Sequence, residues 1–150
     1  MTVDTVETQP RVIAAVRRSV RIGEVGAAWK PALDVVWAFL RAHPELKPGH
    51  NVFLYHHPAA RSDPMDVDFG VEVLREFEPE GDVRVARTPA GETAHATHRG
   101  PYDKMKDTHD AIHSWAEQNR RQIGRASWEV YGDWSNDPSK LETEIFYLLG

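Results

Sequence analysis

The stretches 51–57 (NVFLYHH) and 127–134 (SWEVYGDW) decide the fold, because they align with each other although they lie far apart in the chain. Both are rich in β-branched and aromatic residues, a composition typical of strands. The alignment continues from 66–74 (DVDFGVEVL) to 141–149 (LETEIFYLL), which are again strand-like. Two copies of one structural unit are therefore predicted.

A helix is predicted ahead of each of these strand pairs. Residues 28–42 carry apolar side chains at helical spacing, with Pro31 in the first turn, and residues 101–119 show the same kind of pattern. Each helix follows strand-like sequence, at 11–21 (RVIAAVRRSVR) and at 83–99. The predicted order is therefore strand, helix, strand, strand, and then the same again.

This order predicts an α+β fold made of duplicated βαββ units, with pseudo-repeats at about 11–77 and 83–149. The strands of the two units can pair in one antiparallel sheet with both helices on one face. The other, concave face is then open and is the expected ligand site. A single domain is predicted over 11–150, with residues 1–10 expected to form a flexible N-terminus.

Composition narrows the class of protein. The 150 residues carry a net charge of −5 and no long basic run, which argues against direct binding to nucleic acid. No apolar stretch approaches the roughly 20 residues of a membrane helix, and the acidic start of the chain does not resemble a secretory signal. With no cysteine in the sequence, a cytoplasmic location is expected.

Glu129 is the first candidate for a functional residue. Strand alternation places Glu129 and Tyr131 on one face of their strand and Trp128 and Val130 on the other. A partly buried carboxylate among aromatic rings is unfavourable unless a cation or a proton-transfer task compensates for it. Glu129 is therefore predicted to anchor a ligand, and a solvent-facing charge without a function is the alternative.

Aromatic side chains on the neighbouring strands suit stacking on a flat or cationic ligand. The candidates are Phe53, Tyr55, Trp128, Phe146 and Tyr147. In addition, the corner formed by Gly100 and Pro101 predicts the start of a helix that places Tyr102 near the rim of the sheet. For Tyr102 a structural role and a role in the pocket both remain open.

The histidines raise the question of a metal site. His109 and His113 have the four-residue spacing that lets two imidazoles bind one metal ion. His109 also belongs to an apolar stripe of its helix, however, and the sequence marks no third ligand. We therefore expect His109 to pack against the sheet. The paired strand histidines are likewise expected to be surface or packing residues: His56, His57, His95 and His98.

The run THRGPYDKM (97–105), the following helix, SWEVYGDWSNDP (127–138) and the ending TEIFYLL (143–149) resemble the GyrI-like family of small-molecule-binding domains. The resemblance implies a duplicated βαββ domain that serves as the effector-binding part of multidrug-sensing regulators. Glu129 matches the ligand-facing acid of the family. Tyr131 is similar to its strand neighbour and Tyr102 to the aromatic residue of the GPY corner, whereas Trp128 stands where many relatives have proline.

Two functions in particular follow as expectations from this resemblance. The first is a freestanding protein that captures aromatic or cationic organic compounds, as in drug or toxin sequestration, because only about ten residues precede the first predicted strand and leave no room for a helix-turn-helix. The alternative is a cofactor-independent hydrolase of electrophilic cyclopropanoid genotoxins, in which Glu129 activates water and Tyr131 or Tyr102 hydrogen-bonds the developing negative charge. A protein partner is possible, as for a gyrase inhibitor, but the small acidic excess does not favour it.

No cofactor is expected, because the sequence has no GxSxG elbow, phosphate loop or dinucleotide-binding glycine pattern, and no metal site is expected either.

Overall fold

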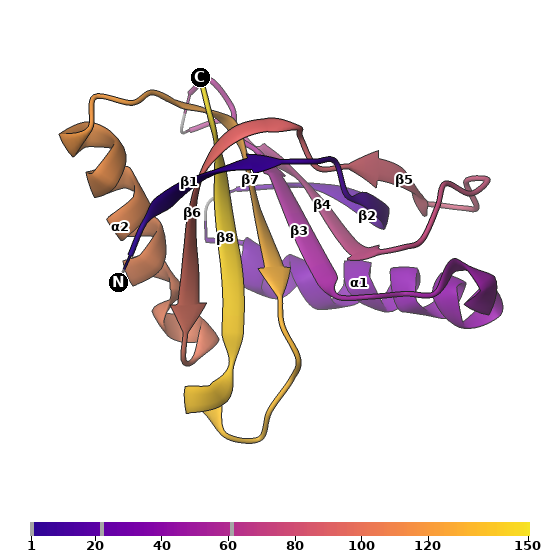
Figure 1. Cartoon of the computed structure of the whole chain (residues 1–150). Coiled ribbons are helices and arrows are strands. Elements are labelled where there is room, and N and C mark those ends of the chain that lie inside the picture. The colour runs from indigo at the N-terminus through magenta and orange to yellow at the C-terminus, as the bar shows by residue number, and fades with distance from the viewer. Residues whose placement is uncertain (1, 22, 61) are drawn as a thin grey trace.

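The computed structural model describes residues 2–21, 23–60 and 62–150, and within these ranges it contains eight strands and two α-helices (Figure 1). The helices are α1 (Val25–Ala42) and α2 (Met105–Gln118). The strands are β1 (Asp4–Thr8), β2 (Val12–Val20), β3 (Asn51–His56), β4 (Met65–Glu72), β5 (Arg84–Arg87), β6 (Gly91–Arg99), β7 (Ile123–Tyr131) and β8 (Glu142–Leu149).

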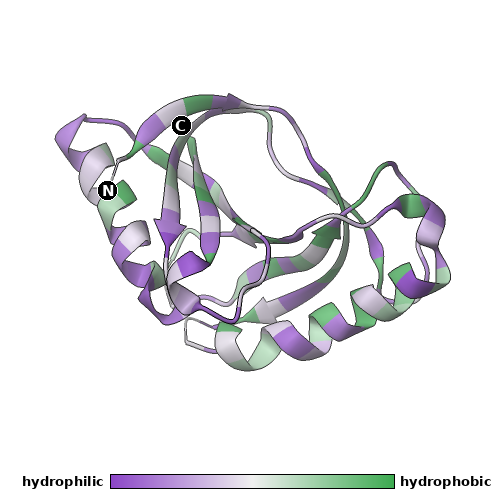
Figure 2. Ribbon diagram, turned by 60° about the horizontal axis from the view of Figure 1, so that its bottom comes forward, coloured by the Kyte–Doolittle hydropathy of each residue, from purple (hydrophilic) through white to green (hydrophobic). Residues whose placement is uncertain are grey.

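All eight strands form one antiparallel sheet in the order β1-β6-β8-β7-β3-β4-β2-β5. Helix α1 packs on β2 and β4, whereas α2 packs on β6 and β8, so each helix covers its own half of the sheet. Hydrophobic and hydrophilic residues alternate along both helices, as Figure 2 shows, which gives each an apolar stripe for this packing. The predicted α+β fold with both helices on one face is confirmed.

The N-terminal segment differs from the prediction. Residues 1–10 were expected to be flexible, but Asp4–Thr8 forms β1, which pairs antiparallel with β6. The Thr93 hydroxyl adds a hydrogen bond to the carbonyl oxygen of Val6 at 3.0 Å. The mostly polar sequence of β1 shows little strand pattern of its own, because its place is set by the free edge that β6 offers. Met1 lies outside the described residues.

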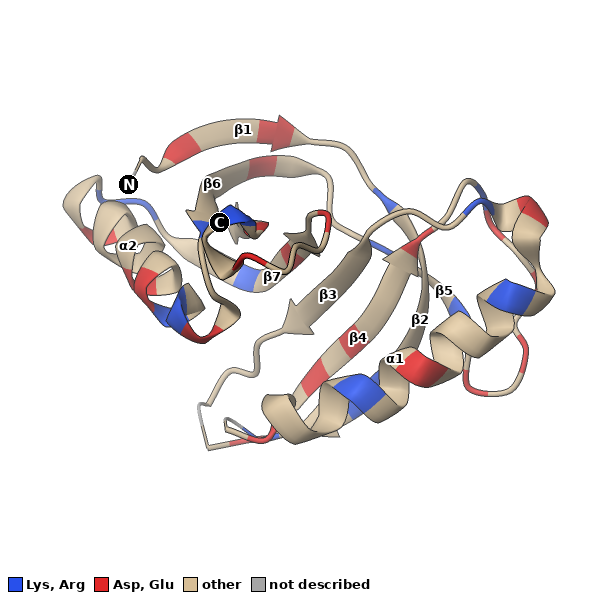
Figure 3. Ribbon diagram, turned by 90° about the horizontal axis from the view of Figure 1, so that it is seen from below, with Lys and Arg blue, Asp and Glu red and all other residues tan. Residues whose placement is uncertain are grey.

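The short link between β1 and β2 forces the sheet to curl. Between β1 and β2 lie five other strands, so a flat sheet would separate them by about 29 Å at roughly 4.8 Å per step. The link from Thr8 to Val12 spans at most about 14 Å. The two edges of the sheet must therefore approach each other, and Figure 3 shows the chain passing from β1 across to β2, with α1 and α2 outside the curl.

The curl gives the sheet two unlike faces. The concave face is filled by an apolar cluster that includes Ile13, Leu54, Trp128 and Phe146. The convex face carries both helices, and β3 and β7 lie between them, beneath a gap in the layer of helices that side chains fill. Glu129 lies on this convex face, where its carboxylate is hydrogen-bonded to His109 of α2. The candidate residue Glu129 thus lies on the helix-bearing face and not on the concave face where it was expected, because the curl fills the concave face with core side chains.

A buried charge on the concave side gives a prediction for acid stability. The fully buried Asp68 carboxylate is bonded to Nε2 of His56 at 2.8 Å and to Nε of Arg17 at 2.9 Å. Burial alone would raise the pKa of Asp68, but hydrogen bonds from His56 and Arg17 lower it to about 2, from 3.8. A lowered carboxyl pKa stabilises the fold above the unfolded value, and this contribution is lost as the pH falls from about 4 to about 2.

We therefore expect Asp68 to contribute about 2 kcal/mol to the pH dependence of the free energy of unfolding between pH 4 and pH 2. Denaturant titrations of the native protein and of Asp68→Asn at pH 4 and at pH 2 give the free energy of unfolding of each protein at each pH. The contribution of Asp68 is the difference between the two proteins in how far this free energy falls from pH 4 to pH 2. An equal fall in both proteins would contradict the assignment.

Candidate functional site

Glu129 is the centre of a hydrogen-bonded cluster on the convex face. Its side chain is nearly fully buried, with 5% of the residue exposed. The hydroxyl groups of Tyr55 and Tyr131 donate to Oε1 at 2.6 and 2.7 Å, and Nε2 of His109 lies 2.8 Å from Oε2. A buried carboxylate is tolerated only when its lone pairs are satisfied, and these three donors supply that compensation.

Strand register and helix packing bring these donors together. On the neighbouring strand, β3, Phe53 lies opposite Glu129, so Tyr55, two residues further on, points to the same face. Tyr131 reaches the carboxylate from two residues along β7 itself. His109 comes from α2, the helix that packs on β6 and β8. The cluster therefore joins both halves of the duplicated fold.

The two phenols are fixed as hydrogen-bond donors. Burial, and then the negative charge of Glu129, raises the pKa of Tyr55 and of Tyr131 well above the usual value of 10. Both hydroxyls therefore keep their protons at any physiological pH. Because both donate to the same oxygen, Oε1 of Glu129 acts only as an acceptor.

The hydrogen bonds continue from Glu129 towards the far end of the gap. The other ring nitrogen of His109, Nδ1, lies 2.7 Å from the hydroxyl of Tyr147. Ser127 lies opposite Tyr147 on the neighbouring strand, and its Oγ lies 2.6 Å from Nε2 of His57. We call this series of five side chains, from Glu129 to His57, the relay chain.

A cavity of about 630 Å³ opens at the His57 end of the relay chain, between α2 and the connection from β3 to β4. It is lined by His57, Pro58, Asp63, Met65, Asp110, His113, Ile123, Gly124 and Tyr147. Glu129 does not form part of this wall, since His109 and Tyr147 stand between its carboxylate and the cavity. The volume is sufficient for an organic molecule of moderate size.

The charge of Glu129 nevertheless acts at the cavity wall. The pKa of Tyr147 is raised, first by burial and second by the negative charge of Glu129. A charge that disfavours a phenolate at this position favours a cation beside it by the same physical effect. The cavity is thus electrostatically suited to positively charged molecules.

A group of aromatic rings covers the opposite end of the gap. Phe53 and Tyr131 meet edge to face with their centroids 4.9 Å apart. Tyr102 packs edge-on against Tyr131 at 5.5 Å, and Trp29 of α1 lies 6.2 Å from Phe53. Tyr102 and Trp29 are both partly exposed, so they form a rim that closes this end of the gap.

Most of the residues predicted from sequence do lie together. The convex-face cluster contains Glu129, Tyr131, Tyr55, Phe53 and Tyr147, with Tyr102 at its edge. By contrast, Trp128 and Phe146 stack on each other on the concave face, with centroids 5.2 Å apart, so the structure does not bring them to the site. Strand alternation separates each of them from its neighbour in the cluster.

The sequence reasoning missed the polar partners of Glu129. His109 was expected only to pack against the sheet, and His57 to be a surface or packing residue, yet both belong to the relay chain. The spacing of His109 and His113 was the available signal, because it places both imidazoles on one helix face. Nothing in the sequence marked Ser127, which is a buried strand residue.

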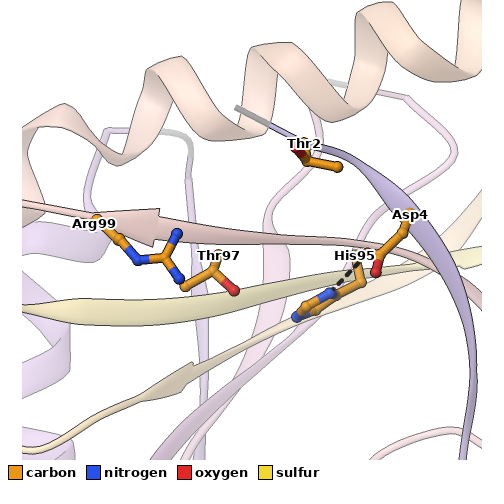
Figure 4. A pocket seen from close by; sticks show the side chains of 5 residues that line it. All are labelled: Thr2, Asp4, His95, Thr97 and Arg99. Atoms are coloured by element: carbon orange, nitrogen blue, oxygen red, sulfur yellow. Dashed lines mark hydrogen bonds and ion pairs between the residues drawn. The ribbon is translucent and has the colours of Figure 1, made fainter.

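A second, more polar hollow of about 530 Å³ lies between β1 and β6, lined by Thr2, Asp4, His95, Thr97 and Arg99 (Figure 4). Its histidine is already engaged, because Nδ1 of His95 bonds Asp4 at 2.9 Å and Nε2 bonds Glu144 at 3.1 Å. None of the side chains of the relay chain reaches this hollow. It is therefore distinct from the Glu129 site.

Within the described ranges, no group of three or more His, Cys, Asp or Glu side chains is arranged to bind a metal ion. Neither α1 nor α2, nor any other described helix, has the length and hydrophobicity needed to cross a membrane.

Comparison with known proteins places this site in context. The chain matches the GyrI-like small molecule binding domain over residues 1–149. No curated protein matches it. Among solved structures, the crystal structure of the EcmrR C-terminal domain is similar with a TM-score of 0.80 and 21% identity, covering 99% of this chain and 97% of that one. The EcmrR chain in a cryo-EM structure of an EcmrR–DNA complex gives the same TM-score at 22% identity, with 99% of this chain covering 57% of that one.

Two further similarities concern proteins with described ligands or activities. SAV2435 bound to tetraphenylphosphonium has a TM-score of 0.73 and 13% identity, covering 100% of this chain and 94% of that one. A hydrolase from Listeria innocua has a TM-score of 0.68 and 12% identity, and the match covers 99% of this chain and 91% of that one. At these identities the likeness shows the fold alone.

Proposed function

Because the chain belongs to the GyrI-like family of small-molecule-binding domains, we propose that it captures aromatic organic cations in the cavity beside Tyr147. The observation that carries this proposal is the buried Glu129 carboxylate, whose charge acts on the cavity wall through His109 and Tyr147. Burying a carboxylate is unfavourable, and a cavity that binds neutral ligands would gain nothing from its charge.

The walls of the cavity fit such a ligand. The rings of His57 and Tyr147 lie nearly parallel with centroids 6.1 Å apart, and His113 meets Tyr147 edge to face at 5.0 Å. Aromatic rings of this kind bind flat ligands and cations. The carboxylate of Asp63 adds negative charge at the wall, where Asp110 also lies, paired with Lys106 at 2.7 Å. SAV2435, which shares the fold, binds a lipophilic aromatic cation.

Calorimetry with matched pairs of aromatic compounds tests this proposal. Each pair consists of a cation and a neutral compound of the same shape, such as trimethyl(1-naphthylmethyl)ammonium and its uncharged carbon analogue. We expect the native protein to bind the cations with one site per chain and to bind the neutral analogues at least about tenfold more weakly. Equal affinities within each pair would overturn the proposal.

A second candidate function is hydrolysis of an electrophile in the same cavity. The observation that favours it is the pair of Glu129 and His109, whose imidazole is hydrogen-bonded in turn to Tyr147 on the cavity wall, because a general base and its orienting partner are arranged in this way. A structure of this fold from Listeria innocua is described as a hydrolase. Incubation of trace protein with excess cyclopropanoid compound distinguishes the two functions: capture gives at most one equivalent of ring-opened product, and catalysis gives many.

A further inference from the structure

Two aromatic rings on the cavity wall stand parallel to each other. The rings of His57 and Tyr147 are inclined by only 7°, their centroids lie 6.1 Å apart, and both residues line the cavity. Tyr147 belongs to β8 and His57 directly follows β3, with β7 between these two strands. Strands two positions apart in a sheet are separated by roughly 10 Å, so the two rings lean towards each other above β7.

Ser127 of β7 holds one of these rings in place. It is buried, and it lies opposite Tyr147 in the pairing of β7 with β8. Its Oγ lies 2.6 Å from Nε2 of His57, and this hydrogen bond restricts the rotation of the imidazole. The backbone N–H of His57 also donates to the carbonyl oxygen of Arg125 at 2.8 Å. Because serine is small, the rings of the flanking strands can approach each other above it.

The ring of Tyr147 is restrained by other partners. Its hydroxyl lies 2.7 Å from Nδ1 of His109, and Nε2 of His109 lies 2.8 Å from the carboxylate of Glu129. His113 meets the same ring edge to face, with centroids 5.0 Å apart. Side chains that are already ordered lose less entropy when a ligand binds, so both rings are preorganised for a ligand that contacts their faces.

The separation of the two rings is close to the separation in a stack of three rings. Aromatic carbon atoms contact each other at about 3.5 Å, so one flat ring between two others holds the outer pair about 7 Å apart. The centroids of His57 and Tyr147 are about 1 Å closer than that, a difference that small rotations of the side chains supply. A cation shaped like a propeller is thicker than one ring and does not fit between them.

We propose that His57 and Tyr147 form a clip that holds a flat aromatic cation between their rings, and that Ser127 is the positioning residue of this clip. The cavity consequently prefers flat aromatic cations over propeller-shaped ones. This inference rests on the proposed function, because it names the shape of the ligand that the same cavity takes.

Calorimetry with two cations of different shape tests the preference. N-methylacridinium is flat and methyltriphenylphosphonium is a propeller, and each carries one permanent positive charge. We expect the native protein to bind N-methylacridinium roughly fivefold more tightly, because both faces of this ligand contact a ring. In His57→Leu the preference should disappear through weaker binding of N-methylacridinium. Equal affinity of the native protein for the two cations, or an unchanged preference in His57→Leu, would overturn the inference.

His113→Leu is the matched control for the loss of a ring. His113 lines the same cavity, but its ring is inclined by 70° to that of Tyr147 and is not part of the clip. Its replacement should change the two affinities to a similar extent, so the preference for the flat cation should remain. Loss of the preference in this variant as well would contradict the assignment of the clip to His57 and Tyr147.

Ser127→Ala tests the positioning role. The variant removes the hydrogen bond to His57 and keeps both rings, so we expect the preference for N-methylacridinium to fall by roughly threefold. The affinity for methyltriphenylphosphonium should change by less than about twofold. A purely structural role of Ser127 would weaken the binding of both cations alike, and that result would overturn the positioning role.

Nuclear Overhauser effects in the native protein give a test that needs no variant. Ring protons of bound N-methylacridinium should show these effects to ring protons of both His57 and Tyr147. Effects to only one of the two rings, or to neither, would overturn the clip and leave the proposed function standing. Failure of both cations to bind would contradict the proposed function itself.

Discussion

Replacing Glu129 with leucine is expected to lower the free energy of unfolding by about 3–5 kcal/mol. Leucine fills the volume but leaves the hydroxyls of Tyr55 and Tyr131 and one nitrogen of His109 without their acceptor. A buried polar group without a partner costs about 1–3 kcal/mol, and three such groups lose their partner together. Chemical denaturation of the native and variant proteins measures the difference.

Glu129→Gln is the matched control for this prediction. It keeps an oxygen for the two phenols and a hydrogen-bonding group for His109, so we expect a loss of no more than about 1 kcal/mol. If leucine and glutamine had similar small effects, the hydrogen bonds around Glu129 would not contribute to stability as the structure indicates.

Replacing Trp128 with alanine is expected to destabilise the fold by about 3–5 kcal/mol while leaving ligand affinity within about twofold of the native value. Trp128 is only 1% exposed and stacks on Phe146 inside the curl of the sheet. It lies on the concave face, so a cavity left there does not change the walls of the convex-face site. Denaturation gives the stability, and calorimetry with an aromatic cation gives the affinity under conditions in which the variant is folded.

Trp134→Ala serves as the control, because Trp134 is 71% exposed and its loss is expected to change stability by no more than about 0.5 kcal/mol. A large fall in affinity for a folded Trp128→Ala protein would contradict the assignment of Trp128 to the concave core.

The duplicated strand pattern was sufficient to predict the fold class, and local alternation was sufficient to place Glu129 and Tyr131 on one face. Whether Glu129 lies on the concave or the convex face of the sheet could not be predicted, because this depends on the curl. That curl arises from the short link between β1 and β2, whose strands lie near opposite edges of the sheet. Since β1 is specified by pairing with β6 rather than by its own pattern, the sequence offered no sign of this closure.

The polar partners of Glu129 were hidden for a related reason. Tyr55 could be aligned with Tyr131 by repeat symmetry, but His109 approaches from a helix and His57 from the end of another strand. Contacts of that kind depend on the packing of α2 against the sheet, which periodicity does not specify. An apolar stripe that contains a histidine predicts that the histidine is buried, but it does not reveal the partner.

The most direct test of the account is the affinity of Glu129→Gln for an aromatic cation and for its neutral analogue, compared with the native protein. The variant keeps a hydrogen-bonding group for each partner in the cluster and removes the negative charge, which we expect to weaken binding of a quaternary cation roughly tenfold. Binding of the neutral analogue should change by less than about twofold. An unchanged affinity for the cation, in a variant that is folded and as stable as expected, would show that the charge of Glu129 does not act on the cavity.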